Sequence, residues 1–251
     1  MDGKKAFEAS AEVYDLLYKD KNYNEEVEFI KQFFKEQKNS SPKVLELGCG
    51  TGNYLEILSK EGFEVTGVDI SEEMLKIAGK KCNCKLIQSD LVDLKLNEKF
   101  DICLVMFDVL GYITKNEDLE KVLTKINQHL NEGGLLIFQV WNGSAVLFHH
   151  PEEGTREAED DDLKVIRYKH PVLKAFEETV DVHFKYKVLD KKTNVSQEFE
   201  ETHPMRYFFP QEIDFLLQTN DFEPIKISEF MNSNKKPDES TWELFVVAKK
   251  K

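Results

Sequence analysis

The chain has 251 residues, of which 41% are hydrophobic, and it carries a formal net charge of -13 from 34 Lys and Arg against 47 Asp and Glu. A chain of this length can bury a sizeable core, and negative charge spread along it disfavours a nucleic-acid partner. The most apolar run, 102–113, is short and includes Asp108, so neither a signal peptide nor a membrane span is expected. These features predict a cytoplasmic protein without a membrane partner, in which the four cysteines remain thiols.

Between residues 43 and 140, mostly apolar runs alternate with segments that repeat apolar residues at helical spacing. Ser71 is expected to cap one helix, and Asn116 another, which stops at the pair Gly133 and Gly134. In chain order the predicted elements are strand 43–48, helix 52–61, strand 63–69, helix 72–81, strand 84–88, strand 100–106, helix 116–130 and strand 134–140. This alternation predicts a parallel sheet with right-handed crossovers.

After Trp141 the pattern changes to alternation with period two, which is typical of antiparallel strands. Such strands are predicted within 162–173, 176–190 and 197–209, with a turn at "DKKTN", whereas the acidic segment 149–162 is expected to be a solvated loop. A helix over 210–220 and strands near 222–230 and 242–249 follow. The sequence therefore predicts a doubly wound, mostly parallel seven-stranded α/β domain (1–143 and 209–251) with an inserted antiparallel β subdomain (144–208), which would lie over the carboxyl edge of the sheet.

A glycine-rich turn, "ELGCGTG", joins the first predicted strand to the first helix of this series. Its glycines, Gly48, Gly50 and Gly52, allow the backbone to approach a ligand closely. The dinucleotide-binding fingerprint places its third glycine one position later, where this chain has Asn53. The turn therefore favours a ligand other than NAD.

Further polar and aromatic residues follow the next strands of the predicted sheet. Asp69 ends the second strand, Asp90 follows the third, and the fourth runs into a loop with Phe107 and Tyr112. An open parallel sheet binds its ligand at the carboxyl ends of its strands, so these residues are expected to meet there.

Together with the glycine turn, this series resembles the class I S-adenosylmethionine-dependent methyltransferases over residues 43–141. The resemblance implies a Rossmann-like fold and S-adenosylmethionine as the cofactor, with the turn at its methionine portion, Asp69 at the ribose and Asp90 at the adenine. The cofactor-binding residues that it implies are Tyr14, Tyr23, Glu46, Gly48, Cys49, Gly50, Gly52, Asp69, Ile70, Met74, Asp90, Leu91 and Phe107. Methyl transfer from a sulfonium needs alignment and exclusion of water rather than a protein nucleophile, and aromatic faces suit the cation.

The whole chain is also similar to the N-methyltransferases of nucleotide-linked amino sugars, through "AEVYDLLYKDKNYNEEVEFI", "MFDVLGYI", "VWNGSAV" and "EETHPMRYFFPQEIDFLL". In that group the N-terminal segment, here 1–40 with Tyr14 and Tyr23, forms a helical lid over the donor. The loop after the fourth strand carries His in some members, where this chain has Tyr112, so Tyr112 or Asp108 could assist the loss of a proton from an amine acceptor. The residues expected to act in catalysis are Tyr112, Asp108 and Tyr14.

The acceptor is expected to be a small molecule, with an amino or hydroxyl group of a sugar or nucleotide-linked sugar as the favoured guess. The candidate substrate-binding residues are Tyr112, Trp141, Asn142, Arg167 and Arg206, and the two arginines suit phosphate oxygens. His170, His183 and His203 lie on the inserted strands, and any of them could face the pocket.

Two alternatives stay open in the sequence. The chain could be a non-catalytic S-adenosylmethionine-binding sensor or assembly subunit, if side chains fill the acceptor pocket. An NAD-type oxidoreductase is disfavoured by Asn53. Cys82 and Cys84 have a C-x-C spacing that no second Cys or His pair completes, so no metal site is expected, and the protein is expected to be a monomer or homodimer.

Overall fold

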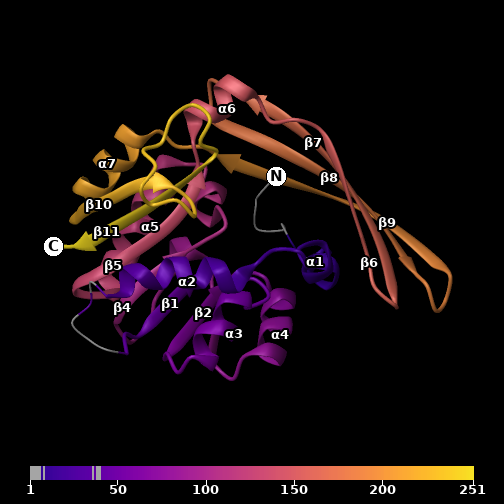
Figure 1. The fold of residues 1–251 in the computed structure, drawn as a ribbon, viewed down its shortest axis with the longest axis horizontal. Helices are drawn as coiled ribbons and strands as arrows, with labels where there is room; N and C mark the ends of the chain where they lie inside the picture. The colour runs from indigo at the N-terminus through magenta and orange to yellow at the C-terminus, as the bar shows by residue number, and fades with distance from the viewer. Residues whose placement is uncertain (1–6, 8, 36, 38–40) are drawn as a thin grey trace.

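The computed structural model describes residues 7, 9–35, 37 and 41–251, which form two sheets (Figure 1). The larger sheet has seven strands in the order β10-β11-β5-β4-β1-β2-β3. They are β1 (Val44–Leu47), β2 (Val65–Asp69), β3 (Lys85–Gln88), β4 (Phe100–Val105), β5 (Leu130–Trp141), β10 (Phe222–Glu229) and β11 (Glu243–Lys250). The strands from β5 to β3 are parallel, whereas β11 runs antiparallel to β5 and β10. The predicted α/β class with a mostly parallel seven-stranded sheet is confirmed.

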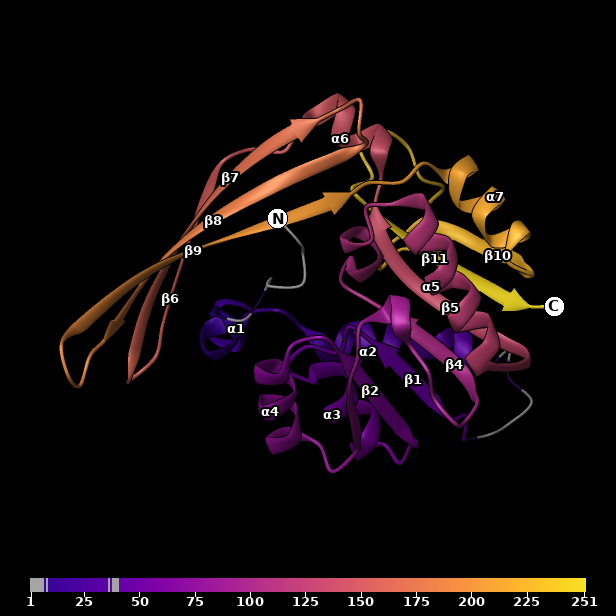
Figure 2. The ribbon, with the colours of Figure 1, turned by 180° about the vertical axis from the view of Figure 1, so that it is seen from behind.

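Helices cover both faces of this sheet (Figures 1 and 2). The helices are α1 (Ala11–Leu17), α2 (Tyr23–Phe34), α3 (Asn53–Lys60), α4 (Glu72–Lys81), α5 (Asn116–His129), α6 (Gly143–His149) and α7 (Pro210–Thr219), with the short 3-10 helices η2 (Leu91–Asp93) and η3 (Val109–Tyr112). Neighbouring strand residues point to opposite faces: Val44 packs in the core under α2 and α3, and Leu45 in the core under α5 and α7. Because both faces are covered, the strands read as apolar runs.

The helix boundaries depend on local hydrogen bonding and are partly as predicted. Ser71 caps α4 by accepting from the Met74 N–H at 3.2 Å, as expected. The prediction for Asn116 is wrong, because Lys115 occupies the N-cap position of α5 without a side-chain cap. The Asn116 side chain instead accepts from Arg206 Nη1 at 2.6 Å.

The glycine pair at 133 and 134 does not stop α5, contrary to prediction. The helix ends at His129 and β5 begins at Leu130. The register with β4 then shifts, since Phe100 pairs with Leu130 but Ile102 pairs with Leu135. Gly133, with φ of +75°, provides the left-handed backbone at this irregularity.

The second sheet is antiparallel, in the order β6-β7-β8-β9. Its strands are β6 (Gly154–Glu159), β7 (Leu163–Lys174), β8 (Thr179–Asp190) and β9 (Val195–Arg206). The expectation of a solvated loop over 149–162 is wrong for β6, because Ala158 pairs with Val165 and both pack against Val13 of α1. All four strands fall within 144–208, and the division into two domains stays a prediction.

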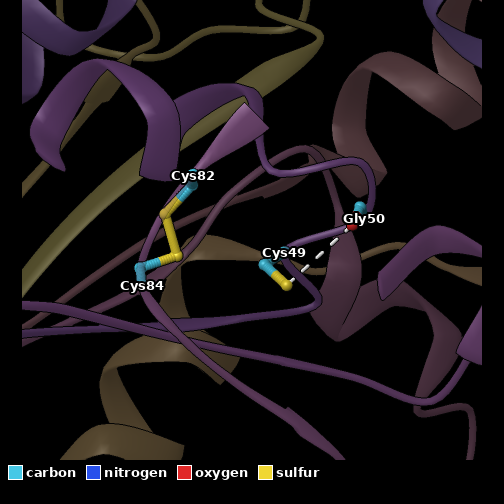
Figure 3. Close-up of a disulfide and its surroundings, with 4 residues drawn as sticks. All are labelled: Cys49, Gly50, Cys82 and Cys84. Carbon is cyan, nitrogen blue, oxygen red and sulfur yellow. Dashed lines mark hydrogen bonds between the residues drawn. A yellow bond between two sulfur atoms is a disulfide. The ribbon is translucent and has the colours of Figure 1, made fainter. Parts of the chain in front are cut away.

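The cysteines depart from the prediction of four thiols. Cys82 and Cys84 form a disulfide with a Cα–Cα distance of 5.3 Å (Figure 3). Cys49 and Cys103 are free and buried. The chain becomes extended at Cys82, directly after α4, so the side chains two residues apart lie on the same side. None of the helices in the described part of the chain is long and apolar enough to cross a membrane.

Candidate active site

The glycine-rich turn after β1 is held in shape by Asp69, at the end of β2. Gly48, Gly50 and Gly52 have φ of +69°, +51° and +77°, a left-handed backbone that other residues adopt only with strain. Asp69 Oδ2 accepts from the Gly50 N–H at 2.8 Å, and its Oδ1 accepts from the Ser71 N–H at 2.9 Å. The carboxylate therefore joins the turns that follow two neighbouring strands.

A cavity of about 480 Å³ lies beside this turn. Its wall contains most of the residues predicted to bind the cofactor: Tyr14, Tyr23, Glu46, Gly48, Cys49, Gly50, Asp69, Ile70, Met74, Asp90, Leu91 and Phe107. A side chain at Gly50 would meet no described atom within 4 Å, so the backbone there faces open space. Gly52 is not part of the wall, because a Cβ at this position would lie 2.9 Å from the Ala78 Cβ of α4.

Glu46 places an acidic group in the wall of the cavity. Its Oε2 is buried and has no hydrogen-bond partner among the described residues. Burial, followed by the nearby charge of Asp69, raises the pKa of this carboxyl well above its ordinary value. A carboxyl oxygen without a partner at a cavity suits a ligand with an ammonium group, and the amino-acid end of S-adenosylmethionine carries one. The residues present therefore fit that cofactor.

Asp90 and Cys49, two further residues predicted to bind the cofactor, lie on the same wall. Asp90 follows β3 and caps η2 by accepting from the Val92 N–H at 3.0 Å. Burial raises the pKa of the Cys49 thiol, so this cysteine is a packing residue rather than a nucleophile.

Aromatic rings from separate segments line the cavity on its other side. Tyr14 comes from α1, Phe107 follows β4 and Tyr112 ends η3, while the Phe7 ring centroid lies 5.8 Å from those of both Tyr14 and Tyr112. Lys21 Nζ lies 4.5 Å from the Phe107 ring centroid. Aromatic faces suit a sulfonium cation, so rings in this wall are compatible with the expected cofactor.

Polar contacts fix α1 beside the glycine turn. Asp15 Oδ1 accepts from Thr51 Oγ1 at 2.7 Å, and Asp15 Oδ2 pairs with Lys81 Nζ of α4 at 2.6 Å. These contacts hold Tyr14 over the cavity although the helix has only two turns. Helix α1 lies between the large sheet and the second sheet (Figure 1).

Tyr112 belongs to a buried chain of polar groups that sequence reasoning did not find. Its hydroxyl lies 2.8 Å from His203 Nδ1, and His203 Nε2 lies 3.2 Å from Glu201 Oε2. The spacing of Glu201 and His203 on β9 places both side chains on one face of that strand, but nothing in the sequence joins them to Tyr112. His183 and His170 are exposed and contact other groups, so only His203 of the three candidates approaches the cavity.

Asp108 and Trp141 lie behind the wall rather than in it. Asp108 has φ of +61° and lies against Glu243 of β11 and the Trp141 indole. Burial, followed by the charge of Glu243, raises the pKa of Asp108 well above its ordinary value. Trp141 packs in an apolar cluster with Val146 and Tyr207.

The remaining candidate substrate residues are engaged within the protein. Asn142 caps α6 and donates to the backbone carbonyls of residues 238 and 241 at 2.9 and 2.8 Å. Arg167 donates to the Tyr18 hydroxyl at 3.1 Å, and Arg206 pairs with Glu212 and Asn116. The structure therefore does not bring these three side chains into the cavity wall, and their roles stay predictions.

Comparisons with known proteins agree with this geometry. The model of the methyltransferase domain family matches residues 19–227. A curated relative, the dTDP-3-amino-3,4,6-trideoxy-alpha-D-glucopyranose N,N-dimethyltransferase of Streptomyces venezuelae, is 33% identical over 134 residues, which is 52% of this chain and 56% of that enzyme. The alignment thus spans little more than half the length of that relative.

Two solved structures resemble the chain over nearly its whole length. Streptomyces venezuelae DesVI has a TM-score of 0.78 at 25% identity, covering 96% of this chain and 98% of DesVI. An S-adenosylmethionine-dependent methyltransferase from Clostridium acetobutylicum has a TM-score of 0.80 at 24% identity, covering 98% and 99%, and shows the shared fold. The resemblance to S-adenosylmethionine-dependent methyltransferases is confirmed. This chain belongs to the methyltransferase domain family and has the fold of the class I S-adenosylmethionine-dependent enzymes.

Proposed function

We propose that the protein transfers a methyl group from S-adenosylmethionine to an amino group of a nucleotide-linked sugar. The cavity carries this proposal, because it combines an unpaired acid, Glu46, at the glycine turn with the polar side chain of Tyr112 on the aromatic wall. An amine is preferred to a hydroxyl acceptor because the Streptomyces venezuelae relative is named for N-methylation of such a sugar.

The residues of the cavity have separate roles in this proposal. Gly48, Gly50 and Glu46 bind the methionine end of the cofactor, Asp69 the ribose and Asp90 the adenine. When bound, the cofactor supplies a methyl group already activated by its positive sulfur.

The protein then needs only to align the acceptor, exclude water and receive a proton from the nitrogen. Tyr14, Phe107 and Tyr112 enclose the reacting atoms with their rings. Tyr112 is the side chain that receives the proton. Arg167 and Arg206 remain proposed phosphate ligands only if a bound substrate draws them from their internal partners.

Calorimetry and methyl incorporation test this function. Folded protein is expected to bind S-adenosylmethionine and its demethylated product with micromolar affinity, and to transfer labelled methyl to dTDP-3-amino-3,4,6-trideoxy-α-D-glucopyranose. Absence of cofactor binding would remove the proposal. Methyl transfer only to hydroxyl groups in a panel of nucleotide sugars would support methyltransferase activity but contradict the proposed amino acceptor.

A non-catalytic cofactor-binding subunit is the second candidate. It would require a filled acceptor pocket, whereas the cavity here is open and is lined by Tyr14 and Tyr112. A protein that binds the cofactor but methylates no member of a broad panel of nucleotide sugars and extract metabolites would favour this candidate.

The setting of the enzyme is also part of the proposal. We infer a cytoplasmic monomer or homodimer that acts on small molecules and has no nucleic-acid or membrane partner. Its cofactor domain comprises 1–143 and 209–251, and its substrate subdomain comprises 144–208. The lid over 1–40 is partly outside the described residues, since 1–6, 8, 36 and 38–40 are not among them. Light scattering during gel filtration measures the oligomeric state.

A further inference from the structure

The inserted sheet places a buried histidine and a buried glutamate behind Tyr112, outside the described cavity wall. His203 is 2% exposed and Glu201 is 9% exposed, and both lie on β9. Tyr112, whose hydroxyl contacts His203, belongs to η3 of the large domain. Three polar groups from two parts of the fold thus form one continuous line: Tyr112 Oη, the His203 ring and the Glu201 carboxylate.

We propose that His203 and Glu201 are positioning residues that enable Tyr112 to accept the proton of the acceptor nitrogen, an inference that rests on the function proposed above. Tyr112 is the only member of the line that lies in the described cavity wall. His203 therefore acts on the substrate through Tyr112, and Glu201 acts through His203.

Hydrogen-bond directions follow from the partners of the imidazole. Glu201 Oε2 also accepts from Ser10 Oγ at 2.8 Å, and Glu201 Oε1 accepts from the Ser10 N–H at 3.1 Å and the Ala9 N–H at 3.2 Å. Burial acts to raise the pKa of Glu201, but hydrogen bonds from His203 and Ser10 outweigh it and lower the pKa. An ionised Glu201 accepts from His203 Nε2–H, which leaves Nδ1 as the acceptor for the Tyr112 hydroxyl.

A proton can move along this line without forming a phenolate at Tyr112. The ammonium form of the acceptor gives a proton to Tyr112 Oη as the Tyr112 O–H proton passes to His203 Nδ1, which leaves the amine with a free lone pair. The nitrogen lone pair forms the new C–N bond while the C–S bond breaks, and the electron pair of that bond stays on sulfur. Tyr112 remains a neutral phenol, and the positive charge rests on the His203 ring beside Glu201.

This route avoids a phenolate that the site disfavours. Burial, followed by the nearby Tyr18 and Asp108, raises the pKa of Tyr112 well above its ordinary value. A free phenolate would therefore be a costly intermediate, whereas an imidazolium beside a carboxylate is a compensated pair.

The surroundings of the histidine complete the setting. The ring of Phe7 lies 4.6 Å and that of Phe184 5.0 Å from the His203 ring, both edge to face. The titratable groups that contact His203 are Tyr112 from η3 and Glu201 from β9, and Tyr186 of β8 lies near Glu201. Arg167 of β7 adds its charge through its interaction with Tyr186. Apolar rings thus limit the access of water to the imidazole, so the carboxylate is its main polar partner besides Tyr112.

The test combines enzyme kinetics with nitrogen-15 spectra of the histidine rings, both measured on the full chain. His203→Asn retains an acceptor for the Tyr112 hydroxyl but cannot take up a proton. Its kcat for the dTDP-linked amino sugar is expected to fall about 100-fold at pH 7, with unchanged cofactor affinity. The deficit is expected to shrink as pH rises, because more of the acceptor then arrives as the free amine rather than as the ammonium. Glu201→Gln and Tyr112→Phe should show the same pH-dependent deficit and keep the inference testable if His203→Asn does not fold.

A matched control separates the relay from packing. His183→Asn makes the same change at an exposed histidine on the neighbouring strand. This variant should retain wild-type turnover. A deficit that does not vary with pH in the folded variants, or wild-type turnover in all three of them, would overturn the inference.

Nitrogen-15 spectra of the histidine rings test the relay even if the sugar is not the acceptor. The relay requires a neutral His203 with its proton on Nε2 at pH 8, assigned by comparison with His203→Asn. A proton on Nδ1, or a doubly protonated ring, would refute the relay whether or not methyl transfer occurs. Failure of cofactor binding by the wild type would instead refute the proposed function.

Discussion

Replacing Asp69 by Asn tests the link between the glycine turn and β2. The carboxylate accepts two backbone N–H groups, from Gly50 at 2.8 Å and from Ser71 at 2.9 Å. An amide has only one oxygen and its NH₂ group faces the second donor, so one buried N–H loses its acceptor. An unsatisfied buried group costs about 1–3 kcal/mol. For a chain of this size, that free energy corresponds to a fall in Tm of roughly 2–12 °C.

Thermal unfolding with and without saturating S-adenosylhomocysteine measures this effect. We expect Asp69→Asn to lower the Tm of the ligand-free protein and also to reduce the ligand-induced rise, because the ribose loses a charged acceptor. Asp93→Asn is the matched control, since Asp93 is exposed on η2 and surface changes alter stability by about 0.5 kcal/mol or less.

Two results would contradict this reasoning. An unchanged Tm for Asp69→Asn would mean that the two N–H bonds do not determine the stability of the turn. A full ligand-induced rise in Tm would remove Asp69 from the cofactor site while leaving its structural role intact.

Three further substitutions have expected outcomes. Burial raises the pKa of Glu46 in the folded state. The free energy of unfolding of the wild type should therefore fall as pH rises from about 4.3, where Glu46 ionises in the unfolded chain, towards the raised folded-state pKa. Glu46→Gln should flatten this decline, measured by urea titrations at pH 5–8. Gly52→Ala adds left-handed strain and a Cβ 2.9 Å from Ala78, and should lower the unfolding free energy by about 2–4 kcal/mol in the same titrations, whereas a neutral effect would contradict the close packing. Arg206→Ala breaks the pair with Glu212 and should cost at most about 3 kcal/mol while calorimetric cofactor affinity stays unchanged; weaker binding would assign Arg206 to the site.

Strands and helices of the large domain could be predicted because each has a strong local signal. Val44, Leu45 and Leu47 form an apolar run that only a strand covered on both faces explains, and the Ser71 cap begins α4 where expected. The N-cap of α5 and the strand β6 could not be predicted in this way. Asn116 is engaged by Arg206 from β9, and Ala158 turns inward only because α1 covers it.

The proximity of the glycine turn and Asp69 was also predictable from the sequence. Gly50 and Asp69 are close because the carboxyl ends of neighbouring parallel strands meet, so their positions in the chain already imply their proximity. The two arginines show the limit of this reasoning. Arg167 and Arg206 have the right chemistry for phosphate, but the choice between a ligand and an internal partner depends on neighbours such as Glu212.

The sequence by itself determined the α/β fold, the glycine turn and the acids that follow successive strands, since period and spacing along the chain encode them. Only the tertiary structure decided which histidine approaches the cavity, because Tyr112 and His203 are 91 residues apart and meet where β9 packs against η3. The disulfide of Cys82 and Cys84 was likewise decided by the path of the backbone after α4. Contacts of this kind depend on how elements are placed in space, and the residue pattern of one strand or helix does not specify which other element it packs against.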